Sequence, residues 1–310
     1  MSESIPKPET ENDLDVPAFV LAHPFVKSTD ADTILRSSDG VDFYVYKAIL
    51  SLVSPVFQTM FMLPQPEPNP PIPVVDLQED SALLDKALRF FYPGTQSVVA
   101  IVDDLRDIIE VLVSKYDIQS VVATATQHLL KYVEAKPLAV YSIAVAHRWD
   151  EMAIMAAKQS LKSPLQIDAE APPELNHLTA VMYHKLLHYH HRCSVAAKYQ
   201  TQSLRHVPYP NEYVRFRCTS CASDSLNWYL SDGEAYPVRL WFIEYLKSMG
   251  EILARTPGID IHTHKSVYEA LKKATKCATC KGMVFDQFSD FVSHLASEIE
   301  KAIDEVELKF

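Results

Sequence analysis

Four of the five cysteines in this 310-residue chain form two C-x-x-C pairs, and these residues are the ones best suited to chemistry. Cys218 and Cys221 make the first pair, and Cys277 and Cys280 make the second. A C-x-x-C turn presents two thiolates to one ion, and two such turns complete a tetrahedral Zn²⁺ site. The spacing predicts a structural zinc centre. The alternative is four thiols that pack separately.

Residues 222–276 separate the two pairs, which is a long gap for a compact zinc finger. We expect residues 226–253 to form one helical excursion that returns the second pair to the first. A redox couple is the other chemistry open to a C-x-x-C pair, but a thioredoxin-like pair lies at a strand-to-helix junction in a βαβ unit. No such unit is predicted before either pair, so a thiol oxidoreductase is the weaker hypothesis.

Several histidines crowd a second region, a long helix predicted at 178–200. His184 and His188 share one face at i, i+4, which is the spacing of metal ligands on a helix. The H-E-x-x-H pattern is missing because position 185 is Lys. We therefore favour a polar helix face, with the nearby Cys193 as a core thiol.

The composition argues against an enzyme and against nucleic-acid binding. The sequence has no G-x-S-x-G, G-x-x-x-x-G-K-[ST] or G-x-G-x-x-G motif, and nothing gathers a nucleophile, a base and an oxyanion donor. The formal net charge of −11 repels phosphate backbones. We expect a protein that is not an enzyme, and a zinc-dependent nucleic-acid binder is a less favoured alternative.

The chain offers no segment suited to a membrane. Residues 1–17 are polar and acidic, and residues 1–20 are predicted to form a disordered tail rather than a signal peptide. The most apolar stretch, at 98–113, is interrupted by charged residues and cannot span a bilayer. We expect an intracellular protein, in the cytoplasm or the nucleus, whose thiols are free or metal-bound.

The elements expected before residue 133 combine a short sheet with helices. Residues 31–45 predict a hairpin around Asp39-Gly40, because Gly accepts the positive φ of such a turn. Residues 46–61 predict two short helices divided at Ser54, which acts as an N-cap. A proline-rich loop follows, and then a short strand in 73–77 and helices at 81–94, 102–118 and 119–133.

This order of elements resembles the BTB/POZ domain. The segments that carry the resemblance are SSDGVDFYVYKAIL, SPVFQTMF, ALLDKALRFFYPG and VLVSKYDI, within residues 21–133. The sequence is most similar to the large group of fungal, mainly basidiomycete, BTB-domain proteins. The resemblance implies a compact α/β unit, often a dimer, that serves as a protein-interaction module.

Two departures from the family pattern bear on the partner. The residue before Lys47, usually His in the family, is Tyr46. The glutamate that ligase-recruiting relatives carry after the third-helix hydrophobe has no clear counterpart, because Glu67 lies inside the proline run. A substrate adaptor of a cullin-class ubiquitin ligase is therefore the second hypothesis, after a self-associating interaction protein.

The resemblance also points to residues of the dimer groove. It implies that Asp32 and Lys47 form a partly buried ion pair that shapes a pocket floor, and the alternative is two ordinary surface charges. The apolar segment that contains Phe19, Val20 and Phe25 is expected to pack in a shared two-fold interface. The alternative is that this segment folds back on its own domain.

The remainder is expected to be mainly α-helical. Residues 134–165 resemble the start of a BACK region, with helix throughout 136–161. Residues 175–310 are expected to form a helical domain that carries both C-x-x-C pairs, apart from an extended stretch at 206–216. Its last helix shows an apolar seam that we expect to dock on the WFIEYL helix (241–246), and the seam consists of Phe288, Phe291, Leu295, Ile299, Ala302 and Val306.

Together these features predict an α+β BTB/POZ-like domain, with a short sheet flanked by helices, followed by a mainly α-helical C-terminal region. The expected function is a non-enzymatic protein–protein interaction scaffold that forms homodimers. One structural Zn²⁺ is the expected cofactor. No nucleic-acid or membrane partner is expected.

Overall fold

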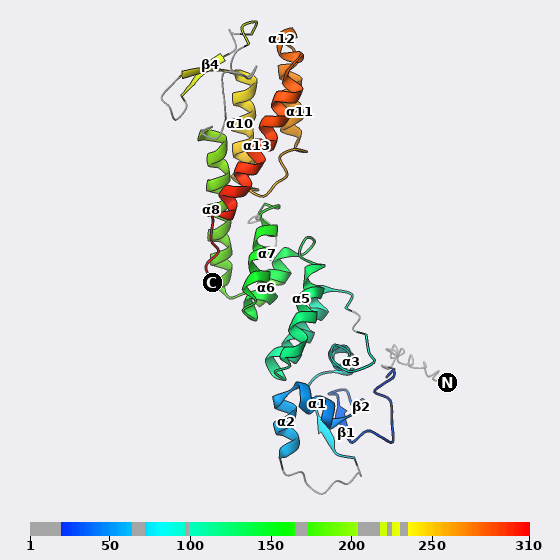
Figure 1. Ribbon diagram of the computed structural model, residues 1–310. Helices are drawn as coiled ribbons and strands as arrows, with labels where there is room; N and C mark the ends of the chain where they lie inside the picture. The colour runs from blue at the N-terminus through cyan, green and yellow to red at the C-terminus, as the bar shows by residue number, and fades with distance from the viewer. Residues whose placement is uncertain are drawn as a thin grey trace, which may run out of the picture. The chain divides into compact units, whose positions relative to one another are not determined.

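The computed structural model describes residues 20–63, 72–96, 99–164, 173–203, 218–221, 225–229 and 235–310. The chain divides into two compact units, Met1–Leu130 and Lys131–Phe310, which are described separately (Figure 1). The predicted tail at 1–20 lies outside the described residues except for Val20, and the predicted extended stretch at 206–216 lies wholly outside them.

The first unit contains a three-stranded sheet with the order β2-β1-β3. Strand β1 (Thr33–Arg36) pairs with β2 (Asp42–Val45) in antiparallel fashion and with β3 (Val74–Asp76) in parallel fashion. Gly40 has a φ of 83° in the turn between β1 and β2, a conformation that costs Gly little. The hairpin and the short third strand are both as predicted.

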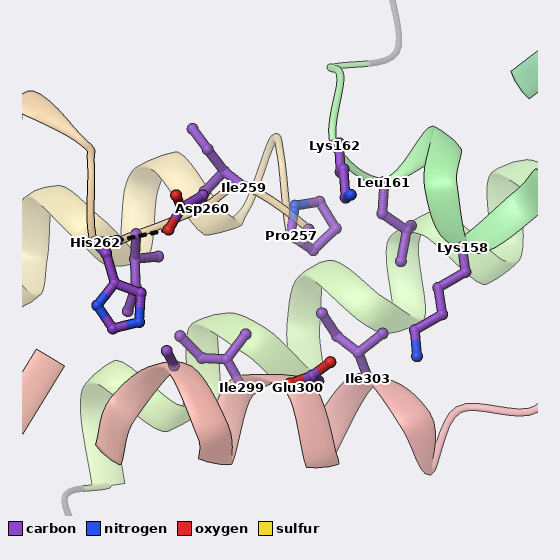
Figure 2. Close-up of a pocket in the computed structure, with 13 residues that line it drawn as sticks. Lys158, Leu161, Lys162, Pro257, Ile259, Asp260, His262, Ile299, Glu300 and Ile303 are labelled. Carbon is purple, nitrogen blue, oxygen red and sulfur yellow. Dashed lines mark hydrogen bonds between the residues drawn. The ribbon is translucent and has the colours of Figure 1, made fainter. Parts of the chain in front are cut away.

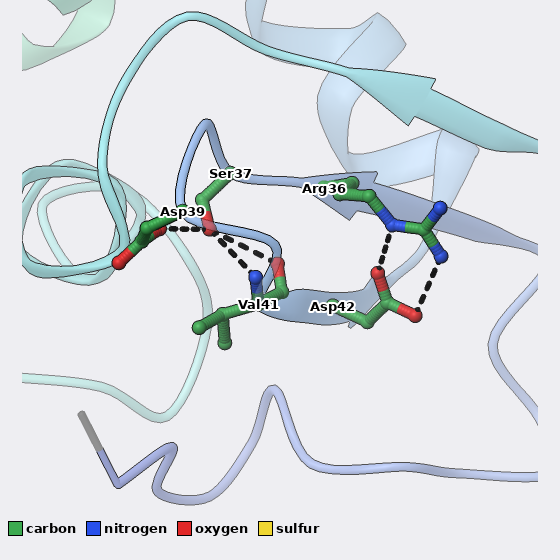
Figure 3. A network of polar contacts seen from close by, with 5 residues as sticks. All are labelled: Arg36, Ser37, Asp39, Val41 and Asp42. Carbon is green, nitrogen blue, oxygen red and sulfur yellow. Dashed lines mark hydrogen bonds and ion pairs between the residues drawn. The ribbon is translucent and has the colours of Figure 1, made fainter. Parts of the chain in front are cut away.

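Polar contacts hold the hairpin turn together (Figure 3), and Asp39 also ties it to the helix that follows the sheet. The Asp39 carboxylate accepts hydrogen bonds from Ser37 Oγ at 2.5 Å, from Ser81 N at 2.9 Å and from Ser81 Oγ at 2.6 Å. These hydrogen bonds lower the pKa of Asp39, and the one from Ser37 has the largest effect. Across the strands, the Arg36 guanidinium donates to both carboxylate oxygens of Asp42, at 2.6 and 3.0 Å.

The two short helices after the hairpin, α1 (Lys47–Val53) and α2 (Pro55–Met62), divide at Ser54 as predicted. The Ser54 hydroxyl accepts from the Phe57 backbone N–H at 3.1 Å, which is the contact of an N-cap. The unit is completed by helices that surround the sheet: α3 (Ser81–Leu88), α4 (Val102–Ile109), the π-helical η1 (Glu110–Lys115), η2 (Gln119–Val121) and α5 (Val122–Leu130).

Helix α3 ends at Leu88, which corrects the prediction of a helix through residue 94. Pro93 has no N–H to donate to the Arg89 carbonyl, so the helix cannot continue past it. The Thr95 hydroxyl donates instead, to the Arg89 carbonyl oxygen at 3.0 Å and to the Tyr92 carbonyl oxygen at 2.6 Å.

Buried apolar side chains from β1, β2 and the helices α1 to α4, with η1 and η2, form one core in the first unit. Glu79 is the charged exception: its carboxylate accepts from Lys115 Nζ at 2.5 Å and from Tyr116 Oη at 2.9 Å. Burial acts to raise the pKa of Glu79, but these hydrogen bonds and a backbone N–H outweigh it, so the pKa is lowered. The buried charge is therefore compensated by its partners.

The second unit is mostly helical and begins with two helices, α6 (Pro137–Ala146) and α7 (Asp150–Ser160). Residues 147–149 break the continuous helix predicted for 136–161, and Arg148 has a φ of 58° there. The other elements are η3 (Pro173–His177), α8 (Ala180–Ser203), β4 (Ser225–Tyr229), β5 (Ala235–Arg239), α10 (Leu240–Leu253), α11 (Lys265–Ala274), α12 (Ala278–Lys281) and α13 (Val284–Asp304).

The antiparallel β4–β5 hairpin corrects the prediction of one helical excursion across 226–253. Only α10, the second half of that segment, is helical. The Asp232-Gly233 pair in the sequence between the two strands is a hairpin signal that the helical interpretation overlooked.

Helices α8, α10 and α13 pack against one another in the second unit (Figure 1). The ring of Phe242 on α10 lies 4.8 Å from the ring of Phe291 on α13, and the rings of Tyr245 and Phe288 are 4.9 Å apart. The predicted docking of the seam on α10 is confirmed by these contacts. The C-terminal end of the seam differs from the prediction. Ile303 is buried there, whereas Ala302 and Val306 are only half-buried.

Candidate metal centre

The four paired cysteines lie together in the second unit. The Sγ atoms of Cys218 and Cys277 are 3.6 Å apart, those of Cys221 and Cys280 are 3.7 Å apart, and all four lie within 4.8 Å of one another. A tetrahedral ion with Zn–S bonds of about 2.3 Å separates its sulfur ligands by about 3.8 Å. A disulfide would require about 2.05 Å. The separations therefore match the edges of a tetrahedral Zn²⁺ site.

The two C-x-x-C turns face each other with equivalent positions opposed. Cys218 meets Cys277, Cys221 meets Cys280, and between them the hydroxyls of Ser220 and Thr279 lie 2.8 Å apart. Each hydroxyl belongs to the third residue of its C-x-x-C sequence. This hydroxyl pair was not predicted, although a hydroxyl residue at the same place in both pairs is visible in the sequence.

The thiols perturb one another in the way expected of crowded metal ligands. Hydrogen bonding from the Cys280 backbone N–H, with a further contribution from the Cys218 thiol, lowers the pKa of Cys277 to about 7. Burial, followed by the Cys218 thiol, raises the pKa of Cys221 to about 11, and burial also raises the pKa of Cys280. Four thiolates cannot share this space without a cation, and a bound Zn²⁺ would supply the missing charge.

Cationic side chains lie on one side of the cluster. A cavity of about 480 Å³ beside the cysteines is lined by Arg239, Lys273 and Lys276 as well as by Cys221 and Cys277. The Arg239 guanidinium also donates from Nη1 to the Cys221 carbonyl oxygen at 3.2 Å, whereas the Lys273 ammonium donates to Glu244 at 2.8 Å. Zn²⁺ with four thiolates carries a net charge of −2, which Arg239 and Lys276 would offset as outer-shell groups do in metal sites. The residues present therefore fit Zn²⁺.

The residues of the first unit that we predicted to form an interface lie in different environments. Val20 is 85% exposed, and Phe19 lies outside the described residues. Phe25 is fully buried in the core of its own domain, where its ring lies 5.1 Å from the ring of Tyr92 and 5.9 Å from that of Phe43. The assignment of Phe25 to an interface is therefore wrong, because the chain folds back at this residue onto its own domain.

Asp32 and Lys47 come together through the backbone. The Asp32 carboxylate accepts from the Lys47 backbone N–H at 2.7 Å, at the start of α1. The Lys47 ammonium lies 5.7 Å from the centre of the Phe61 ring instead. Asp32 thus satisfies a donor at a helix N-terminus, where its charge is also favourable, and it does not form the ion pair that we expected.

A buried serine–histidine contact in the second unit escaped the sequence analysis. Ser160 Oγ lies 2.9 Å from His190 Nε2 and donates to the Ala157 carbonyl oxygen at 2.6 Å. Because Ala157 O only accepts, the serine proton is committed to it and His190 acts as the donor to Ser160. In this arrangement the serine proton points at a backbone carbonyl and not at the histidine, which is not the geometry of an activated nucleophile.

The second unit also has an apolar cleft of about 280 Å³ beside α13 (Figure 2). Ile299 and Ile303 of α13 form one wall, and Leu161 lies at the end of α7. The Asp260 carboxylate on its rim is already held by the His262 backbone N–H at 3.0 Å. Gly258 lets the loop approach α7, since its N–H donates to Leu161 O at 3.1 Å.

Comparison with known proteins identifies the first unit. Residues 22–132 match the model of the BTB/POZ domain family, and this part of the chain is therefore a BTB/POZ domain, a protein-interaction domain rather than a catalytic one. No curated protein matches the chain. Among the described residues, no helix has the length and apolar character needed to cross a membrane.

Proposed function

We propose that this protein is a non-enzymatic interaction scaffold that forms homodimers through its BTB/POZ domain. In this proposal the second unit presents a helical surface whose cysteine-bearing end is fastened by one structural Zn²⁺. The protein would act in the cytoplasm or the nucleus, where a reducing environment keeps the four thiols available as ligands. The resemblance to the fungal BTB group remains a prediction.

Exposed apolar side chains on the BTB/POZ domain carry the proposal of self-association. Leu52 of α1 is 86% exposed and Val20, ahead of the sheet, is 85% exposed. Met62 at the end of α2 is 74% exposed and Leu63 is 59% exposed. A second copy of the chain would cover such residues, and each buried leucine side chain contributes about 1.5–3 kcal/mol.

Sedimentation of the full chain at micromolar concentration tests this proposal. We expect a dimer for the unmodified protein and a shift toward monomer for Leu52→Glu, because a charge would then enter the interface. Leu130→Glu is the matched control, since Leu130 is an apolar residue of the same domain that is 47% exposed and lies on α5. A monomeric unmodified protein, or equal effects of both substitutions, would contradict the proposal.

The proposed Zn²⁺ has a structural role. Cys218, Cys221, Cys277 and Cys280 would fill all four positions of a tetrahedral ion and leave none for water or a substrate. The ion would join the first C-x-x-C turn to α12, directly before α13. In this way it would fix the cysteine-bearing end of the helical unit without taking part in any reaction.

The alternative function is a substrate adaptor of a cullin-class ubiquitin ligase. Its support is the BTB/POZ match, since domains of this family commonly oligomerise or bind cullin-type partners. Glu67, the acidic residue nearest to the position used by ligase-recruiting relatives, lies outside the described residues. A pull-down with a purified cullin separates the alternatives, because a scaffold that only self-associates retains none.

A further inference from the structure

Helix α8 carries three exposed histidines along one face. His184, His188 and His191 follow the spacing i, i+4, i+7, which places them within an arc of about 60° at 3.6 residues per turn. The opposite face is buried, with Leu186 and Cys193 fully enclosed where α8 packs against α10 and α13. That packing holds the helix backbone in place while the three imidazoles project into solvent.

No other group engages these imidazoles in the part of the chain that the structure describes. His184, His188 and His191 make no hydrogen bond, ion pair or ring contact there. The sequence of α8 contains neither Asp nor Glu, so no carboxylate of the same helix competes for them. His190 differs from the other three, because it is buried and hydrogen-bonded to Ser160.

We propose that His184 and His188 chelate one divalent transition-metal ion of the Zn²⁺, Ni²⁺ or Cu²⁺ type. Residues four apart on a helix have Cβ atoms about 5–6 Å apart, which lets two imidazoles reach an ion at about 2.0–2.1 Å. Neutral imidazole nitrogen suits these metals, whereas Mg²⁺ and Ca²⁺ prefer oxygen ligands. The formal net charge of −11 also favours cations near the surface.

The third histidine, His191, cannot share an ion with His184, because it lies seven residues beyond it, about 10 Å along the helix axis. The i, i+3 pair of His188 with His191 is the competing arrangement, and single substitutions of His184 and His191 distinguish the two. Two protein ligands leave the remaining coordination positions to water. The site therefore exchanges its metal, unlike four cysteines that enclose an ion, and it is independent of the proposed zinc centre.

Nickel titration of the full, tag-free, zinc-loaded chain by calorimetry tests the site. We expect about one Ni²⁺ per chain, as a single bidentate site implies. His184→Gln and His188→Gln should each weaken Ni²⁺ binding by roughly tenfold or more, since each removes one of two ligands. His191→Gln, the matched control, should change the affinity by less than about twofold, because it touches no ligand.

Two further measurements keep the interpretation unambiguous. Gln is a good helix former and all three positions are exposed, so circular dichroism should be unchanged in every variant. Thiolate coordination of Ni²⁺ would give a near-ultraviolet charge-transfer band, which imidazole ligands do not. Absence of Ni²⁺ binding, a thiolate band, or equal loss of affinity in His191→Gln and His188→Gln would overturn the proposal.

Discussion

The BTB/POZ domain and the cysteine-bearing end of the helical unit differ in the elements from which they are built. In the BTB/POZ domain, strands and helices enclose one apolar core, and even its buried carboxylate, Glu79, is paired. The helical unit has a comparable apolar seam between α10 and α13, but its cysteine-bearing end is built from short pieces. Helix α12 has four residues, too few to bury a core of its own.

This difference supports the proposed zinc centre. An element that cannot bury enough apolar surface needs another source of stability, and a metal bound by four thiolates is one that small domains commonly use. Cys218, Cys221, Cys277 and Cys280 lie together beside the four-residue helix α12, whereas Cys193 is a buried residue of the long helix α8 and is not part of the cluster.

Removal of the proposed Zn²⁺ should produce the largest difference between the two units. A structural Zn²⁺ contributes about 10–16 kcal/mol of apparent binding free energy in zinc-finger peptides, and that energy is coupled to local folding. After chelation or Cys280→Ser, hydrogen exchange should accelerate at 218–221 and 276–283 and remain unchanged within 22–130. Cys193→Ala is the control that retains the metal. Equal changes in both units would contradict this account.

Truncation of a core residue should have the reverse pattern. Phe25→Ala removes a fully buried ring, so we expect the BTB/POZ domain to lose about 3–5 kcal/mol of unfolding free energy. Gln127→Ala should change it by less than about 0.5 kcal/mol, because Gln127 is an exposed residue of α5. Guanidinium unfolding gives the unfolding free energy of each variant, and peptide-resolved hydrogen exchange shows which unit is affected. A loss of stability in the helical unit would contradict this prediction.

The buried ion pair of the BTB/POZ domain should make this unit sensitive to acid. The pKa of Glu79 is lowered in the folded state, so its contribution is present above the unfolded-state pKa of about 4.3 and is lost as pH falls through the folded-state value. Glu79→Gln should cost about 1.5–3 kcal/mol at neutral pH and flatten the acid dependence. An unchanged slope of stability against pH between 5 and 2 would refute this.

The smallest effect concerns backbone packing in the helical unit. At Gly258 a Cβ would lie 2.9 Å from Leu161 Cβ and 3.2 Å from Lys162 N, so Gly258→Ala should cost about 1–2 kcal/mol through displaced backbone. At Gly282 the nearest atom is Thr279 O at 3.9 Å, and Gly282→Ala should be tolerated. The midpoint temperatures of thermal unfolding compare the two variants. Equal midpoints would contradict the prediction, because they would show that the loop at Gly258 accommodates the added methyl group.

Local signals in the sequence predicted much of the fold. The Asp39-Gly40 turn, the Ser54 cap and the seam on α13 each depend on neighbours in the chain, and each agrees with the structure. The β4–β5 hairpin was missed because helix α10 follows it directly. The apolar residues of α10, such as Trp241 and Phe242, led us to extend the predicted helix back over the hairpin. Short apolar runs do not distinguish strand from helix by periodicity alone.

The meeting of the four cysteines was predictable, but the detail of their surroundings was not. Identical spacing of the two pairs indicated that they come together, whereas the opposed Ser220 and Thr279 hydroxyls and the approach of Arg239 depend on tertiary folding. Phe25 was misassigned for a similar reason. An apolar segment ahead of a sheet can cover its own core or a partner, and only the three-dimensional position of Tyr92 and Phe43 decides between them.

Metal content of the full chain, purified without chelator, tests the central claim most directly. We expect elemental analysis to find about one zinc per chain, and X-ray absorption at the zinc edge to show four sulfur ligands at about 2.3 Å. The double variant Cys218→Ser, Cys277→Ser should contain none, and Cys193→Ala should retain it. Protein without zinc, or zinc bound through nitrogen and oxygen, would show that these four cysteines are packing residues and that the helical unit is held by its apolar seam alone.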